Sequence, residues 1–159
     1  MGEKERLERE ALTYFLRIYN KKRGRNYRCF ERRERPDFTI RDKDGGTIIG
    51  VEISHIFHDK KEAMMILGRD PSNFHGIITT GDHGKVISYV LKKKSEKVKY
   101  YPFNGPVILV LRDFSSLFDA STIMKHTTGI KVPQSGYKEV WYLTRSNPER
   151  KWDELIRLK

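Results

Sequence analysis

The stretch between residues 36 and 54, PDFTIRDKDGGTIIGVEIS, contains two carboxylates at positions where they could do chemistry. Asp37 follows a proline, and Glu52 stands inside an apolar run that is typical of a strand. A carboxylate that is half-buried costs several kcal/mol unless it has a partner. The stretch therefore predicts either a paired structural charge or a functional site.

The turn between the two carboxylates predicts that they lie close together. The Asp44-Gly45 dipeptide favours a two-residue hairpin turn of type I′, because both central residues of that turn need a positive φ. With this turn, Asp37 lies opposite Glu52 on one face, and the pair of Phe38 and Val51 faces the other way. Opposed carboxylates repel each other unless a cation lies between them. Because both are oxygen donors, we expect Asp37 and Glu52 to bind Mg²⁺ or Mn²⁺.

Hydrophobic periodicity along the chain alternates between helix and strand, without a linker or an internal repeat. We expect helices over 3–19, 60–67 and about 84–100, strands over 27–31, 37–41, 47–57, 106–112 and 139–144, a helical turn near 117–124, and a last helix that starts at Pro148. This pattern predicts one α/β domain over residues 1–159, with a mixed β-sheet flanked by helices in the order αβββ(α)αββα.

Composition limits the classes of partner. Lys and Arg number 32 against 21 Asp and Glu, a formal charge of +11, which favours an anionic polymer, although merely soluble surfaces are also rich in basic residues. No apolar run approaches the roughly 18 to 20 residues of a membrane span, and the charged start MGEKERLERE is unlike a signal peptide. We therefore expect a cytoplasmic protein without a membrane partner. The single Cys29 excludes an internal disulfide.

Pro36-Asp37, a hairpin and then Glu52 resemble the core of the PD-(D/E)XK nuclease superfamily, which has the restriction-endonuclease-like fold. The predicted order of helix, three-strand meander, helix and strand is similar to that family over residues 3–112. The resemblance implies Mg²⁺-dependent hydrolysis of nucleic-acid phosphodiester bonds, with DNA as the expected polymer. The residues themselves do not distinguish DNA from RNA, and they leave open a homodimer or a partner protein.

Ser54 stands where that family has a lysine, so catalysis depends on a replacement. Such a lysine offsets negative charge on the phosphate, and the resemblance implies that the helix after the strand can supply it. Lys94 falls on the apolar stripe of the helix at 84–100, and Lys97 lies at the edge of that stripe. The alternative is that Lys94 extends along the edge of the core to solvent.

The resemblance also implies a further acid from the first helix. Glu8 borders the apolar stripe of that helix and is preferred over Glu10, and Glu31 is a weaker candidate. The alternative is that these are ordinary solvated charges near a helix N-terminus.

Two functions from different classes follow. The first is a metal-dependent nuclease whose site residues are Asp37, Glu52, Lys94 or Lys97, Ser54 and Glu8. The second is a catalytically inactive relative that binds nucleic acid or a protein, with Ser54 marking the lost activity. Opposed carboxylates at 37 and 52 favour the nuclease, because a decayed site has no reason to keep both.

Overall fold

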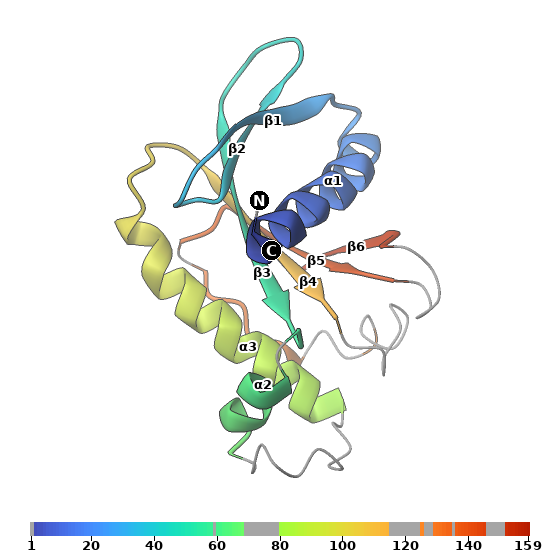
Figure 1. The fold of residues 1–159 in the computed structure, drawn as a ribbon, viewed down its shortest axis with the longest axis vertical. Coiled ribbons are helices and arrows are strands. Elements are labelled where there is room, and N and C mark those ends of the chain that lie inside the picture. Colours follow the sequence, from blue (N-terminus) through green and yellow to red (C-terminus); the bar gives the residue numbers. More distant parts are fainter. Residues whose placement is uncertain are drawn as a thin grey trace.

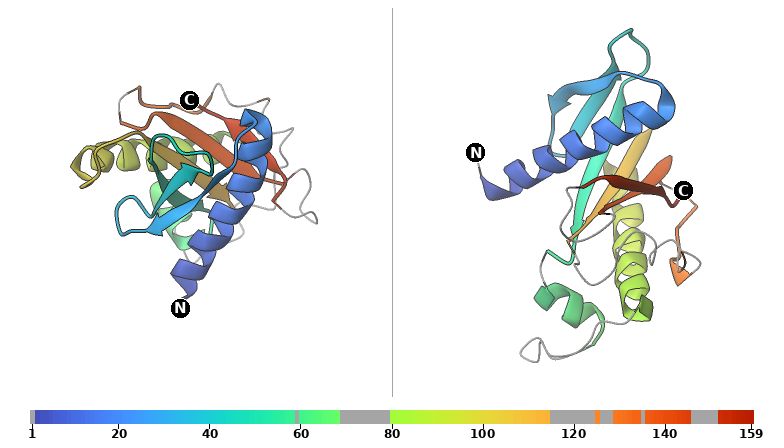
Figure 2. Two further views of the ribbon diagram at one scale, coloured as in Figure 1. Left: turned by 90° about the horizontal axis from the view of Figure 1, so that it is seen from above. Right: turned by 90° about the vertical axis from the view of Figure 1, so that its right-hand side faces the viewer.

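The computed structural model describes residues 2–58, 60–68, 80–114, 125, 129–134, 136–145 and 152–159. Six strands form one sheet in the order β1-β2-β3-β4-β5-β6, and helices cover both of its faces (Figures 1 and 2). The predicted α/β class with a mixed sheet is confirmed.

The helices are α1 (Glu3–Arg23), α2 (Lys60–Ile66) and α3 (Thr80–Lys97), which leads into a short 3₁₀ helix, η1 (Val98–Tyr100). The strands are β1 (Tyr27–Arg32), β2 (Phe38–Asp42), β3 (Ile49–Ile56), β4 (Val107–Asp113), β5 (Glu139–Thr144) and β6 (Glu154–Arg157). β1 to β3 form an antiparallel meander, β4 is parallel to β3 and β5, and β6 is antiparallel to β5. Within the described ranges, no helix is long and apolar enough to cross a membrane.

Alternating side chains of the central strand β4 divide the core into two clusters. Ile108 and Val110 pack on the face that α1 covers, together with Phe15. Leu109 lies on the opposite face with Leu91 of α3. Successive side chains of a strand point to opposite faces, so β4 is buried on both, as its continuous apolar run predicts.

The hairpin of β2 and β3 has the predicted register. Phe38 pairs with Val51, and Ile40 pairs with Ile49. Phe38, Ile40 and Val51 are fully buried in the cluster beneath α1. A slip of one residue would turn these side chains to the other face, so the burial of the apolar pairs fixes the register.

The turn of this hairpin differs from the prediction. The positive φ angles lie at Gly45 (95°) and Gly46 (112°), and Asp44 does not have one. The N–H of Gly45 donates to the carbonyl of Asp42 at 3.0 Å, so a tight turn over 42–45 ends at the first of the two glycines. The type I′ turn at Asp44-Gly45 was therefore wrong, because the longer loop between the strands lets the two glycines take the left-handed conformation instead.

The bounds of two helices differ from the prediction: α1 is longer, and α3 begins earlier in the sequence. α1 continues to Arg23 and ends where Gly24 adopts the left-handed conformation, with φ 60°. The basic residues in its last turn favour this extension, because they interact favourably with the helix dipole. α3 begins at Thr80, four residues before the predicted start at 84. The buried imidazole of His83 lies 2.7 Å from the carboxylate of Asp113, which ties the first turn of α3 to β4.

The predicted last helix is wrong: residues 154–157 form the edge strand β6, paired with β5. Leu155 packs into the cluster beneath α1, whereas Ile156 packs against the opposite cluster. This alternation is the period of a strand, and two adjacent apolar residues do not distinguish it from a helix in sequence. Pro148 and the predicted helical turn near 117–124 lie outside the described residues.

Gly50 of β3 lies against Pro36, the residue before Asp37. A Cβ atom on Gly50 would lie 2.6 Å from Cγ of Pro36 and 3.2 Å from the ring of Phe103. The missing side chain therefore allows the close approach that sets the start of β2 and the position of Asp37.

We predict that Gly50→Ala lowers the free energy of unfolding by about 1–3 kcal/mol, because the added methyl group overpacks the contact with Pro36. Thermal or urea denaturation measures the change. Gly129→Ala is the control, since a Cβ there would meet nothing within 4 Å. A Gly50→Ala protein that melts like the parent would show that Pro36 moves aside without cost.

Candidate active site

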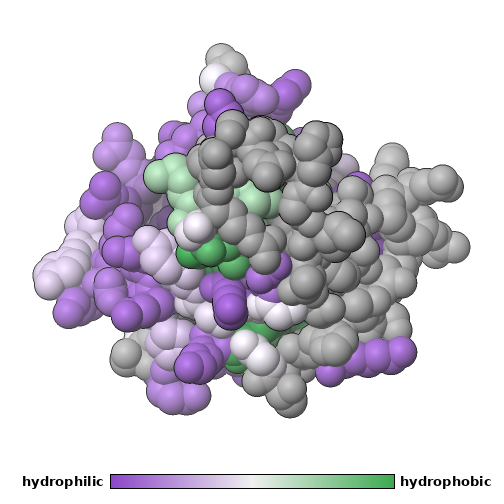
Figure 3. Space-filling view, turned by 90° about the horizontal axis from the view of Figure 1, so that it is seen from below, coloured by the Kyte–Doolittle hydropathy of each residue, from purple (hydrophilic) through white to green (hydrophobic). Residues whose placement is uncertain are grey.

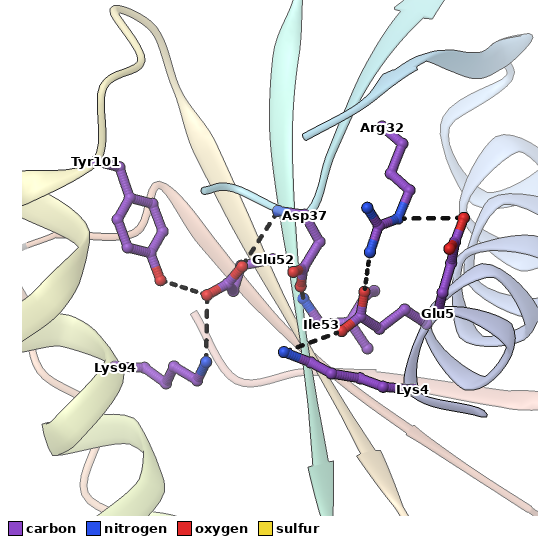
Figure 4. A network of polar contacts seen from close by, with 9 residues as sticks. Lys4, Glu5, Arg32, Asp37, Glu52, Ile53, Lys94 and Tyr101 are labelled. Atoms are coloured by element: carbon purple, nitrogen blue, oxygen red, sulfur yellow. Dashed lines mark hydrogen bonds and ion pairs between the residues drawn. The ribbon is translucent and has the colours of Figure 1, made fainter. Parts of the chain in front are cut away.

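Asp37 and Glu52 lie side by side at the junction of β2 and β3 (Figure 4). The backbone N–H of Asp37 donates to Oε1 of Glu52 at 3.2 Å, and the N–H of Ile53 donates to Oδ2 of Asp37 at 2.8 Å. Each carboxylate thus accepts a hydrogen bond from the backbone of the other strand. The predicted proximity of the two carboxylates is confirmed.

The environment of Asp37 disfavours the ionised form of its carboxyl group, because Glu52 beside it already carries a negative charge. Burial, and then the charge of Glu52, raises the pKa of Asp37 to about 8, although the N–H of Ile53 opposes the shift. Glu52 itself is only 4% exposed. The pair therefore holds a proton readily near neutral pH, and a bound cation would compete for the same position.

Lys94 of α3 reaches Glu52. Its Nζ lies 3.2 Å from Oε2 of Glu52, so the predicted placement of Lys94 on the face toward the sheet is confirmed. Lys97 is exposed, and it makes no ion pair with Glu52 in the part of the chain that the structure describes. Helical spacing thus placed Lys94 correctly beside Glu52, because Lys94 continues the buried stripe of Ile87 and Leu91, and its role in catalysis stays a prediction.

Tyr101, just after η1, was not predicted as part of the site. Its hydroxyl donates to the same Oε2 of Glu52 that Lys94 contacts (Figure 4). Burial is the main reason that the pKa of Tyr101 is raised, so the phenol stays a donor. No local pattern in the sequence links Tyr101 to Glu52, which is 49 residues away, and a tyrosine hydroxyl is the only signal of a polar role.

Tyr137 and Lys94 connect this donor set to the rest of the core. The buried Tyr137 hydroxyl lies 3.4 Å from the backbone carbonyl of Lys94. Burial strongly raises the pKa of Tyr137, so its hydroxyl also remains protonated. This contact steadies the turn of α3 from which Lys94 extends toward Glu52.

Glu8 of α1 lies within electrostatic reach of the pair. It is 3% exposed, and burial raises its pKa; the charge of Glu52 raises the pKa further, and the charge of Lys94 lowers it. Arg32 of β1 lies 3.7 Å from Oε2 of Glu8 (ion pair), and Lys4 lies 3.8 Å from Oε1. Arg32 was not among the predicted residues, because no local pattern links β1 to α1.

The other two acids considered lie apart from the pair. Glu10 lies 3.5 Å from Arg112, and its side chain is 43% exposed. Glu31 is exposed and lies 3.7 Å from Arg33. The preference for Glu8 agrees with its burial, and its role in the site stays a prediction.

Ser54 follows Glu52 on the same face of β3 and lines a cavity of about 510 Å³ between β3, α2 and α3. Lys94 lines this cavity as well. Ser54 and Lys94 therefore lie on two sides of the same cavity, and the replacement of a motif lysine by Lys94 stays a prediction.

The donor set fits Mg²⁺ or Mn²⁺ in part. Two carboxylates from adjacent strands converge, and their mutual repulsion favours a cation. Among the described residues, no group of three or more His, Cys, Asp and Glu could hold a metal ion. Asp37 and Glu52 would thus supply two ligands, and a cation that keeps several waters and binds substrate phosphate suits such an incomplete set.

Comparison of the chain with family models, with curated proteins and with solved structures found no match. The resemblance to the PD-(D/E)XK superfamily therefore stays a prediction.

We predict that Asp37 makes the metal-free protein less stable as pH rises. The folded chain holds the Asp37 proton up to a pKa of about 8, whereas the unfolded chain loses it near its ordinary value of about 3.9. Between these values the folded chain binds more protons, so the free energy of unfolding falls as pH rises. Asp37→Asn should melt at least about 2–4 °C above the parent at pH 8 and lose this advantage at pH 4.

Melting in EDTA by circular dichroism tests this prediction, and the difference between parent and variant is the readout. Asp44→Asn, an exposed acid of the hairpin loop, is the control. An advantage of Asp37→Asn that is equal at both pH values would contradict the raised pKa.

Proposed function

We propose that this protein is a Mg²⁺- or Mn²⁺-dependent nuclease that hydrolyses phosphodiester bonds of nucleic acid, with DNA as the expected polymer. The observation that carries the proposal is the pair of the half-buried Asp37 and the buried Glu52, with the Lys94 ammonium 3.2 Å from Glu52. Two hard oxygen donors and one cationic donor at a single point are the groups that phosphoryl chemistry needs.

Each residue has a role that its contacts support. Asp37 and Glu52 would hold the cation, which when bound stabilises negative charge on the phosphate. Lys94 would hold its ammonium where negative charge builds on the substrate, and Tyr101 would orient the Glu52 carboxylate by its hydrogen bond. Glu8 would add negative charge at the α1 side of the site.

The charge of the whole chain supports a polyanionic substrate. The formal charge is +11, and Lys93, Lys94 and Lys97 all line the cavity beside the carboxylates. Contacts from lysines to phosphates supply affinity that does not depend on sequence.

A second function is an inactive nuclease-like module that binds nucleic acid or a protein. Ser54 favours it, because a serine hydroxyl carries no charge to offset a phosphate. Lys94 favours the nuclease over the inactive module, because helix α3 supplies an ammonium group that lies 3.2 Å from Glu52.

We predict cleavage of DNA or RNA in the presence of Mg²⁺ or Mn²⁺, and its loss in Asp37→Asn and Glu52→Gln. Gel assays on single-stranded and duplex DNA and RNA measure the activity. Mn²⁺ should also raise the melting temperature of the parent at pH 8 and leave that of Asp37→Asn unchanged, because only the intact pair binds the ion. Asp44→Asn should cut and melt like the parent.

Binding of these polymers without cleavage at any metal concentration would support the inactive module. Cleavage that survives both carboxylate substitutions would place the chemistry elsewhere in the chain.

We predict that Lys94→Met lowers the cleavage rate about 10²-fold or more, because a charge that stabilises the phosphate is lost. Mn²⁺ affinity by calorimetry should stay the same or improve, since a nearby ammonium repels the cation. Lys92→Met is the matched control, because Lys92 lies exposed on the same helix. A Lys94→Met protein that cuts at the parent's rate would remove Lys94 from the mechanism.

A further inference from the structure

The cavity beside the carboxylates lies along one side of α3. Its volume is about 510 Å³, within the range of sites that hold small organic groups. Ser54 of β3 and Lys94 of α3 form the end that borders Glu52, and residues of α2 form another wall. On the face seen in Figure 3, where α2 lies, hydrophobic atoms (green) are bordered by hydrophilic side chains (purple).

One stripe of α3 gives this cavity an aromatic and a basic lining. Tyr89, Lys93 and Lys97 follow one another at intervals of four residues, so they lie on one side of the helix. Tyr89 is 43% exposed, and Nζ of Lys93 lies 5.6 Å from the centre of its ring. Among the residues that the structure describes, the lining contains three lysines, counting Lys94, and one acid, Glu62.

These features together are those of a binding site for one nucleotide. An exposed ring stacks on a base of any identity, and neighbouring lysines neutralise the phosphates on either side of that base. The apolar side chains of α2 and α3 provide the floor that a base, and not a free phosphate ion, would cover.

We propose that this cavity binds an unpaired nucleotide next to the scissile phosphate, so that the substrate is single-stranded nucleic acid or a frayed end. The inference rests on the proposed nuclease function for the position of the scissile bond. Tyr89 stacks on the base, and Lys93 and Lys97 bind the flanking phosphates. Lys94 both lines this nucleotide-binding cavity and contacts Glu52 of the carboxylate pair.

Continuous duplex suits the cavity less well. Bases inside a duplex are paired and stacked on one another, so their faces are not available to Tyr89 unless a base is extruded. An acidic peptide would satisfy the lysines, yet it would bring no flat group to the aromatic wall. Stacking therefore distinguishes the proposed ligand from other polyanions.

The test is binding in EDTA, where no cleavage occurs. Fluorescence anisotropy measures the affinity of the full chain for labelled ten-residue oligo-dT, for oligo-rU and for a blunt ten-base-pair duplex, with poly-glutamate as competitor. We expect one of the single strands to bind more tightly than the duplex. Tyr89→Ala should weaken that binding about tenfold or more, and Lys93→Ala should weaken it and reduce its salt dependence.

Phe30→Ala is the matched control, because Phe30 of β1 is another exposed ring with a cation, Arg41, over it, and it does not line the cavity. Circular dichroism melts show that each variant is folded. Equal affinities of parent and Tyr89→Ala for single strands, a preference for duplex, absence of oligonucleotide binding, or displacement by poly-glutamate at equal charge would each overturn the proposal.

Cleavage separates this inference from the proposed function. Binding as expected without metal-dependent cleavage would support the nucleotide-binding cavity and contradict the nuclease proposal. Cleavage that prefers duplex and is unchanged in Tyr89→Ala would support the nuclease proposal and contradict the nucleotide-binding cavity.

Discussion

The partial burial of Asp37 beside the buried Glu52 is the constraint on which this structure depends. Two carboxylates on adjacent strands repel each other, and burial removes the water that would otherwise reduce that repulsion. The backbone can hold them together because the apolar pair of Phe38 and Val51, fully buried under α1, fixes the register one position away. Hydrophobic burial on one face thereby stabilises an unfavourable charge arrangement on the other.

The two carboxylates have unequal surroundings, and this asymmetry defines what each could do. Glu52 accepts hydrogen bonds from Lys94, Tyr101 and the backbone of Asp37, whereas Asp37 accepts one from Ile53. Donors therefore stabilise negative charge on Glu52, and Asp37 is the group at which a proton and a cation compete. Environments that separate two nearby carboxyl groups in this way are typical of sites that do acid–base or metal chemistry.

Features that depend on neighbouring residues in the sequence could be predicted, and features that depend on contacts between distant residues could not. The period of two in the strands placed Asp37 opposite Glu52, and the helical period placed Lys94 toward the sheet, because both signals are local. Tyr101, Arg32 and the edge strand β6 were missed because each depends on a contact between distant parts of the chain. The turn at Asp44-Gly45 was wrong although the register was right, since burial of apolar pairs outweighs turn chemistry here.

The serine at position 54 and the lysine at position 94 are best understood together. A side chain at 54 points into the cavity that Lys94 also lines, so a lysine on β3 would add a second long side chain to the end nearest Glu52. Supplying the ammonium from α3 leaves that end open and still places the charge 3.2 Å from Glu52. Lys94 also directly follows Lys93 in α3 and lines the same cavity as Tyr89. Under the proposed function, moving the lysine from strand to helix therefore joins the reacting groups to a binding surface on one rigid element.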